Sequence, residues 1–412
     1  MNFEDTAEEA AFRLEARGWL ESHAEALAPA EQPPSLAAWH RQPDAVERSK
    51  QWMAKKADDR WACLSWPEEF GGRAASRMEA VIWEQEEQRF RVPPNMFTIG
   101  QGMLGPTIMV HGTDEQKKRY LSPMLRADEV WCQLFSEPAA GSDLAGLATR
   151  AVRDADDWVV NGQKIWTSGA QYCDFGMLLT RTAPENPKHS GITYFIVDMR
   201  SPGIEVRPIR QMNRGQTFNE VFFHDLRLSD QNRVGGVNEG WRGALTTLMN
   251  ERQTLSGGAA GPGFRELLEL ARSVRRNGRP AIEDASVRAR LADVYVQHKG
   301  VQFTRYRSLS ALSRGATPGP ESSIGKIVNA PLRQQTASFA LELLGAGGSV
   351  VDADWAPLGA SFAETYLAAP GGRIAGGTDE VLRNVVAERV LGLPPEPRVD
   401  KGLPFSEIPT GS

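Results

Sequence analysis

The chain has 412 residues, of which 41% are hydrophobic and 24% charged, a composition ordinary for a globular protein with two or three domains. Its net charge of −5 implies no strong general electrostatic attraction to nucleic acid or to an anionic membrane. The three cysteines form no even framework, which favours a reducing compartment, and neither cysteines nor histidines have metal-ligand spacing. The N-terminus is acidic, and no apolar run approaches the ~20 residues that span a membrane. We therefore expect a cytoplasmic protein without a metal or a membrane span.

The first part of the chain, residues 1–127, predicts an all-α domain. Apolar residues recur at helical spacing, and proline or glycine pairs separate the segments. Gly112 predicts the end of one helix, and Thr113 or Asp114 then predicts the cap of the next.

The next part, residues 128–238, predicts short β-strands that form an antiparallel barrel or sandwich. Apolar or alternating runs are separated by turn residues. In the run Asp157–Trp166 the pair Asn161-Gly162 predicts a hairpin turn, because Asn-Gly readily supplies two residues with positive φ.

The third part, residues 239–398, predicts a helical bundle, followed by a proline-containing tail at 399–412 that is extended or loosely docked. Thr378 is a plausible cap of the last helix. The fold class is thus α+β, with helical, β and helical domains in that order. The expected helices of the bundle cover residues 241–255, 264–276, 286–314, 321–344, 362–367 and 378–391.

Two strings in the middle part carry the strongest functional signal. The loop S-E-P-A-A-G-S-D at 136–143 is followed by N-G-Q-K-I-W at 161–166. Taken alone, they indicate only a β segment with a polar loop. Their combination resembles the flavin-binding signature of the acyl-CoA dehydrogenase family. The strings W-P-E-E-F-G-G at 66–72 and H-G-T-D-E-Q-K-K-R-Y-L at 111–121 resemble the helical N-terminal domain of the same family.

The resemblance implies an FAD cofactor and assigns residues to it. Phe135 and Ser136 would contact the pyrimidine edge mainly through backbone groups, and Ser142 would lie near the pyrophosphate and the substrate. Trp166 would lie against the flavin ring, and Ser168 near its N5 atom.

The family removes two hydrogens across Cα–Cβ of an acyl thioester, and this needs a carboxylate base in an apolar pocket. Many members place that glutamate just before a G-T pair, where this chain has Gly376. Others, including members acting on branched or bulky acyl groups, place it on an earlier helix, where this chain has Glu251. Glu251 is therefore the expected base, although it could also be a solvated carboxylate beside Arg252. Asp379 and Glu380 are the rival candidates.

Substrate contacts follow from the same comparison. The backbone N–H at the usual base position, here Gly376, would donate to the thioester oxygen together with a flavin ribityl hydroxyl. Arg252 and Ser142 are further expected substrate-binding residues. The missing side chain at Gly376 leaves room near Cα, so we expect a branched or bulky acyl group.

The adenosine half of FAD matches the family less well. An R-x-x-F-G string expected near 274–278 is absent, and the Q-x-x-G-G-x-G string begins with Glu342. A carboxylate near a pyrophosphate is unfavourable. The chain therefore forms either a homo-oligomer with altered contacts or a mixed complex with a related subunit. Nearby arginines could bind phosphate or form a solvated basic face: Arg272, Arg275, Arg276 and Arg279.

The leading interpretation is an acyl-CoA dehydrogenase of lipid β-oxidation that passes electrons to an electron-transfer flavoprotein. One alternative keeps the fold but uses O₂ as the acceptor, as acyl-CoA oxidases do. Another is a non-catalytic or half-site subunit of a heteromeric dehydrogenase.

Overall fold

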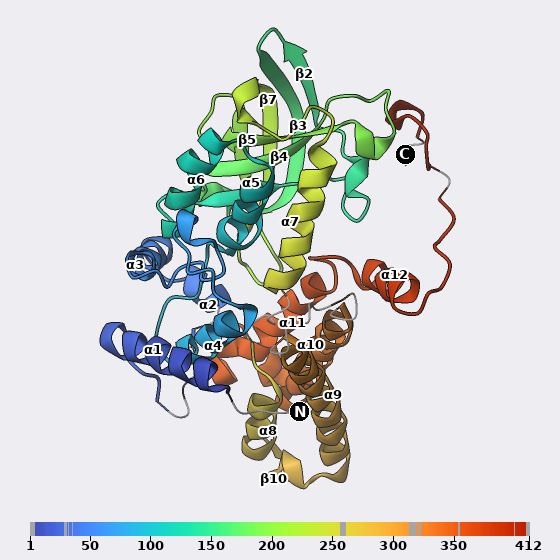
Figure 1. Cartoon of the computed structure of the whole chain (residues 1–412). Helices are drawn as coiled ribbons and strands as arrows, with labels where there is room; N and C mark the ends of the chain where they lie inside the picture. Colours follow the sequence, from blue (N-terminus) through green and yellow to red (C-terminus); the bar gives the residue numbers. More distant parts are fainter. Residues whose placement is uncertain are drawn as a thin grey trace. The chain divides into compact units, whose positions relative to one another are not determined.

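The computed structural model describes residues 5–28, 31, 33–34, 36–255, 261–312, 319, 323–352, 355–398 and 400–408. The chain, whose helices and strands are labelled in Figure 1, divides into two compact units. One contains residues 7–254 and 397–412, and the other contains residues 1–6 and 255–396. The helical, β and helical order expected from the sequence is confirmed. Among the described residues, none of the helices has both the length and the apolar composition needed to cross a bilayer.

Two of the N-terminal helices begin at side-chain caps. Ser76 and Glu79 form a capping box at the start of α4, and Thr113 and Gln116 form another at the start of α6. The predicted break at Gly112 with a cap at Thr113 is therefore confirmed. The helices are α1 (Ala7–His23), α2 (Leu36–His40), α3 (Ala45–Asp58), α4 (Arg77–Glu87), α5 (Gly105–His111) and α6 (Asp114–Arg126).

The middle strands form one eight-stranded sheet in the order β6-β7-β3-β2-β4-β5-β8, with β1 paired to β4. Most pairs are antiparallel, but β1 and β2 both run parallel to β4. Apolar side chains from the sheet and from the N-terminal helices share one core. The strands are β1 (Trp131–Leu134), β2 (Arg150–Asp154), β3 (Asp157–Ser168), β4 (Phe175–Arg181), β5 (Ile192–Asp198), β6 (Ile204–Ile209), β7 (Phe218–Ser229) and β8 (Arg233–Val234).

The predicted hairpin turn at Asn161-Gly162 is wrong. Both residues lie inside the continuous strand β3, and the chain instead reverses between β2 and β3, at Ala155 and Asp156. The pairing of β3 with β7 shifts register between Val160 and Gly162. At this bulge the Asn161 amide exchanges two 2.9 Å hydrogen bonds with Asp225 of β7. The dipeptide therefore lies in a β-bulge, because β3 continues to pair with β7 before and after it.

A second Asn-Gly pair, Asn277-Gly278, makes the kind of turn that the first does not. Asn277 has φ 51° and Gly278 has φ 80°, and they join β9 (Arg275–Arg276) to β10 (Arg279–Pro280). This turn ends the helix expected to reach residue 276, which stops at Ser273 instead.

The C-terminal unit has a core of its own, built from α8, α9, α10 and α11. Its helices agree with the expected segments to within a few residues except at the end of α8 and of α11. The predicted cap is confirmed, since Thr378 Oγ1 accepts a hydrogen bond from the N–H of Val381. The helices are α8 (Phe264–Ser273), α9 (Ala285–Leu312), α10 (Ser323–Leu344), α11 (Ser361–Gly372) and α12 (Asp379–Arg389). The preceding helix α7 (Gly240–Leu255) groups, up to Thr254, with the N-terminal helices and the sheet.

The described part of the tail, residues 400–408, docks on the loop between β4 and β5. The Phe405 N–H donates to the Asn186 carbonyl over 2.8 Å, and the Phe405 ring lies 3.9 Å from the Arg181 guanidinium. Asp400 forms an ion pair with Lys188, which also contacts Asp143. This segment is therefore attached by specific contacts rather than loosely.

Candidate active site

The loop after β1 is held to β3 through its backbone. The Phe135 side chain is buried, with its ring 5.7 Å from that of Tyr194. The side chain of Phe135 therefore packs into the core of the domain. The carbonyl of Ser136 accepts a 2.9 Å hydrogen bond from the N–H of Ile165. This contact places the loop beside the end of β3 that carries Trp166.

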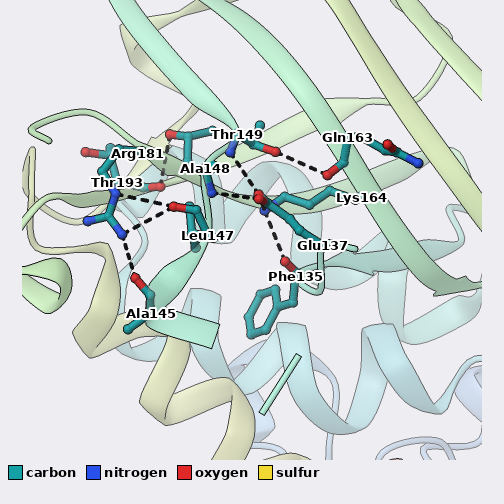
Figure 2. Close-up of polar contacts among 11 residues, drawn as sticks. Phe135, Glu137, Ala145, Leu147, Ala148, Thr149, Gln163, Lys164, Arg181 and Thr193 are labelled. Carbon is teal, nitrogen blue, oxygen red and sulfur yellow. Dashed lines mark hydrogen bonds and ion pairs between the residues drawn. The ribbon is translucent and has the colours of Figure 1, made fainter. Parts of the chain in front are cut away.

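A buried ion pair fixes the same loop from the inside, as Figure 2 shows. Lys164 Nζ lies 2.7 Å from Glu137 Oε1 and 3.0 Å from the carbonyl oxygen of Phe135. Glu137 also accepts hydrogen bonds from the N–H groups of Ala148 and Thr149, at 2.6 and 2.9 Å. Both residues belong to the two strings, but no role was predicted for either of them from the sequence. Their signal was one charge of each sign, one in each of the two strings.

Glu137 links the loop to the pH dependence of stability. Burial by itself would raise the pKa of Glu137, but the Lys164 ammonium and the hydrogen bonds to Thr149 and Ala148 outweigh it, and the pKa lies below its ordinary value. A carboxylate with a lowered pKa in the folded state stabilises the fold above its unfolded pKa, near ~4.3, and this contribution disappears as the pH falls through the folded value.

We therefore expect Glu137→Gln to lower the free energy of unfolding most at neutral pH and least in acid. The difference in the free energy of unfolding between wild type and variant should be constant down to about pH 5 and should shrink below about pH 4. Urea unfolding at a series of pH values from 7 to 3 measures it. A difference that stays the same across this range would contradict the role given to the carboxylate.

Arg181 braces the chain just beyond the loop. Its side chain is buried and donates to the carbonyls of Ala145 and Lys188, each over 2.6 Å, and to that of Leu147. Burial lowers the pKa of Arg181 to about 10. Figure 2 shows Arg181 and the Glu137–Lys164 pair flanking residues 145–149 from two sides. The two groups together leave this turn little freedom, and the exposed residue Ser142 lies just before it.

Trp166 forms an exposed aromatic platform. Its φ of 61° lies in the left-handed region that bulky residues rarely adopt, at a register shift between Lys164 and Thr167. The indole is 56% exposed, and Ser168 follows on the same strand. Such strain concentrates where a side chain must be presented to a ligand. The Thr167 hydroxyl is buried and has no hydrogen-bond partner within the described residues. The exposed indole suits stacking against a flat ring of a ligand, and the hydroxyl groups next to it suit polar atoms at the edge of such a ring.

The helix α7 carries the candidate base. Thr247 Oγ1 lies 2.8 Å from Thr107 Oγ1 on α5 and 3.1 Å from the Tyr194 hydroxyl on β5. One helical turn later comes Glu251, which is half-buried and whose Oε2 lies 3.4 Å from Gln133 Nε2 on β1. The structure thus brings Glu251 beside the strand that leads into the loop. The side chain of Arg252 lies outside the described residues.

Gly376 lies in the C-terminal unit, in the turn before α12. Its φ is 65° and that of Gly377 is 90°. Both values favour glycine, so a side chain at 376 would add backbone strain as well as volume. The Lys326 ammonium on α10 donates to the carbonyls of Ala375 and Gly377, on either side of Gly376. The turn that presents the Gly376 N–H is therefore held by a charged donor.

The two rival carboxylates have other environments. Asp379 is buried, and its Oδ2 accepts a 2.7 Å hydrogen bond from Arg373 Nε. Glu380 is exposed in the first turn of α12, where acidic residues are favoured by the helix dipole. Neither has the half-buried position that Glu251 has.

The surface expected near the adenosine half of a cofactor carries compensated charges. Glu342 on α10 forms an ion pair with Arg290 on α9, and Arg290 lies 4.0 Å from the Phe339 ring. Arg290 lowers the pKa of Glu342 through the hydrogen bond between them. Arg276 lies 3.8 Å from Asp284. The arginines of this region are exposed: Arg272, Arg275, Arg276 and Arg279.

Known proteins share the domain organisation of this chain. Models of the N-terminal, middle and C-terminal domains of acyl-CoA dehydrogenase match residues 6–128, 132–226 and 238–391. The chain is 35% identical over 387 residues to acyl-CoA dehydrogenase IpdE1 of Mycobacterium tuberculosis, covering 93% of this chain and 98% of that protein.

Two solved structures have the same fold along nearly the whole chain. The Tcur3481-Tcur3483 steroid ACAD has a TM-score of 0.77 at 30% identity, covering 96% of this chain and all of that one. The ChsE4-ChsE5 complex from Mycobacterium tuberculosis has a TM-score of 0.77 at 28% identity, with the same coverage.

Proposed function

Since this chain belongs to the acyl-CoA dehydrogenase family, a family of flavin-dependent oxidoreductases, we propose that it converts an acyl-CoA to the trans-2-enoyl-CoA with Glu251 as the base. Two separate observations support the proposal, one in each unit of the chain. Glu251 is half-buried on a helix held by Thr247, and Gly376 occupies the usual base position with a φ of 65°.

In this proposal Glu251 takes the α-proton of the thioester. The N–H of Gly376 donates to the thioester oxygen, where negative charge develops, and Lys326 keeps the turn around Gly376 in place. Bound FAD would accept the β-hydrogen as a hydride at N5. The FAD would be held by the backbone of Phe135 and Ser136, the hydroxyls of Ser142 and Ser168, and the indole of Trp166.

A branched or bulky acyl group, such as a sterol side chain, is the substrate class we propose. Glycine at 376 supports it, because it removes a side chain next to the proposed site of Cα chemistry. The steroid ACAD among the similar structures is consistent with it. Short linear acyl-CoAs should then be poor substrates.

We also propose a heteromeric assembly in the cytoplasm, with a related subunit completing the adenosine half of the FAD site. Its support is Glu342, which stands where the family string has glutamine and is paired with Arg290. The ChsE4-ChsE5 structure is a complex of two named subunits, which agrees with this arrangement. Electrons would pass to an electron-transfer flavoprotein, in the β-oxidation of lipids.

The visible spectrum of the purified chain tests these points together. We expect the flavin-loaded protein to bleach on anaerobic addition of branched or sterol acyl-CoAs and not of short linear ones. A colourless chain that acquires flavin only with a related subunit would support the half-site assembly. A flavin-loaded protein that no acyl-CoA bleaches would contradict the proposed reaction.

A further inference from the structure

One polar side chain stands out in β1, the strand that leads into the active-site loop. Trp131, Cys132 and Leu134 are buried, and the strand pairs in parallel with β4. Gln133 is the half-buried exception. A polar group in an otherwise buried strand requires a hydrogen-bond partner. Its partner is Glu251, through Gln133 Nε2 and Glu251 Oε2 at 3.4 Å.

We propose that Gln133 is a positioning residue that orients the Glu251 carboxylate for proton abstraction. The inference rests on the proposed role of Glu251 as the base. Gln133 and Glu251 come from different elements, β1 and α7, and both elements are anchored independently of this contact. Strand β1 pairs with β4 along its whole length, and α7 is held through Thr247. The hydrogen bond therefore joins two elements that are already fixed, so it sets the orientation of the Glu251 carboxylate and not the position of β1 or α7.

The chemistry of the side chain suits this role. A glutamate on a helix has several rotamers, and a base acts fast only when its oxygen is held at the reacting proton. An amide donor restricts those rotamers without adding a charge. A lysine or arginine in the same place would stabilise the carboxylate much more strongly and so weaken it as a base. Glutamine orients the base at a small loss of basicity.

The test uses two variants that remove the donor and differ in volume. Gln133→Met keeps the side-chain length, and Gln133→Ala leaves a gap. In both, we expect the rate of flavin reduction per bound flavin to fall about 10- to 100-fold, with the Kd for acyl-CoA unchanged. The isotope effect with α-deuterated acyl-CoA should rise, because proton abstraction becomes slower relative to the other steps. A purely structural role would lower flavin content and leave this isotope effect unchanged.

Gln51→Met is the matched control, since it removes a Gln–Glu hydrogen bond (3.2 Å, to Glu47) on the exposed face of α3. It should leave the rate and the isotope effect unchanged. Wild-type rates in both Gln133 variants, or rates that follow the volume of the new side chain, would overturn the inference. Glu251→Gln, assayed in parallel, separates this failure from failure of the proposed function. An inactive Glu251→Gln with unaffected Gln133 variants refutes only the positioning role.

Discussion

Replacing Glu251 with glutamine should leave a folded, flavin-containing protein whose turnover falls about 10²- to 10⁴-fold, the usual contribution of a positioned general base. Glutamine preserves the size of the side chain and its contact with Gln133, but it cannot accept the α-proton. Stopped-flow measurement of flavin bleaching by acyl-CoA reports the loss directly. The flavin spectrum before mixing shows that the cofactor is retained.

Glu380→Gln is the control for this experiment, because Glu380 is the exposed rival in the first turn of α12. It should retain the wild-type rate within a few-fold. The opposite pattern, with an active Glu251→Gln and an inactive Glu380→Gln, would move the base to the usual end of the bundle. It would also remove the basis for assigning a role to Gln133.

Replacing Lys164 with methionine should destabilise the protein by about 3–5 kcal/mol, as expected when one partner of a buried ion pair is removed. Lys164 is fully buried, so methionine leaves the Glu137 carboxylate, whose side chain is only 7% exposed, without its cation. The loop from Phe135 also loses the ammonium that binds its carbonyl. We therefore expect lower flavin content as well. Urea unfolding and the flavin-to-protein absorbance ratio measure the two effects.

Two comparisons separate the buried pair from ion pairs in general. Arg227→Met removes the exposed Arg227–Asp154 pair from the same sheet and should cost no more than about 1 kcal/mol. The double variant Glu137→Gln, Lys164→Met should lose about 0.5–3 kcal/mol less than the sum of the single losses, because no buried charge remains unpaired. If Lys164→Met lowers the free energy of unfolding no more than Arg227→Met does, the role given to the Glu137–Lys164 pair is contradicted.

Local sequence signals gave correct predictions wherever the structure depends on neighbouring residues. The capping pattern at Thr113–Gln116 predicts a helix start, and Thr378 predicts another, because side chain and backbone groups three residues apart settle them. The order of helical and β parts followed from hydrophobic periodicity in the same way. Resemblance, rather than periodicity, supplied the functional hypotheses for Glu251 and Gly376.

The two Asn-Gly pairs show where local signals fail. Asn277-Gly278 makes the turn that its dipeptide favours, whereas Asn161-Gly162 remains in a strand because β3 pairs with β7 on both sides of it. Whether this dipeptide forms a turn or stays in a strand thus depends on pairing partners more than sixty residues away. No local pattern contains that information.

Hydrophobic periodicity predicted the helical, β and helical order, capping residues predicted the starts of α6 and α12, and the motif strings pointed to the family. Three features became visible only in the folded chain: Lys164 pairs with Glu137, Trp166 lies at a register shift of β3, and Gln133 contacts Glu251. The physical reason is sequence separation. A helix cap and a hydrophobic periodicity depend on residues only a few positions apart. Gln133 and Glu251 are 118 positions apart and come into contact only when β1 and α7 pack in the folded chain.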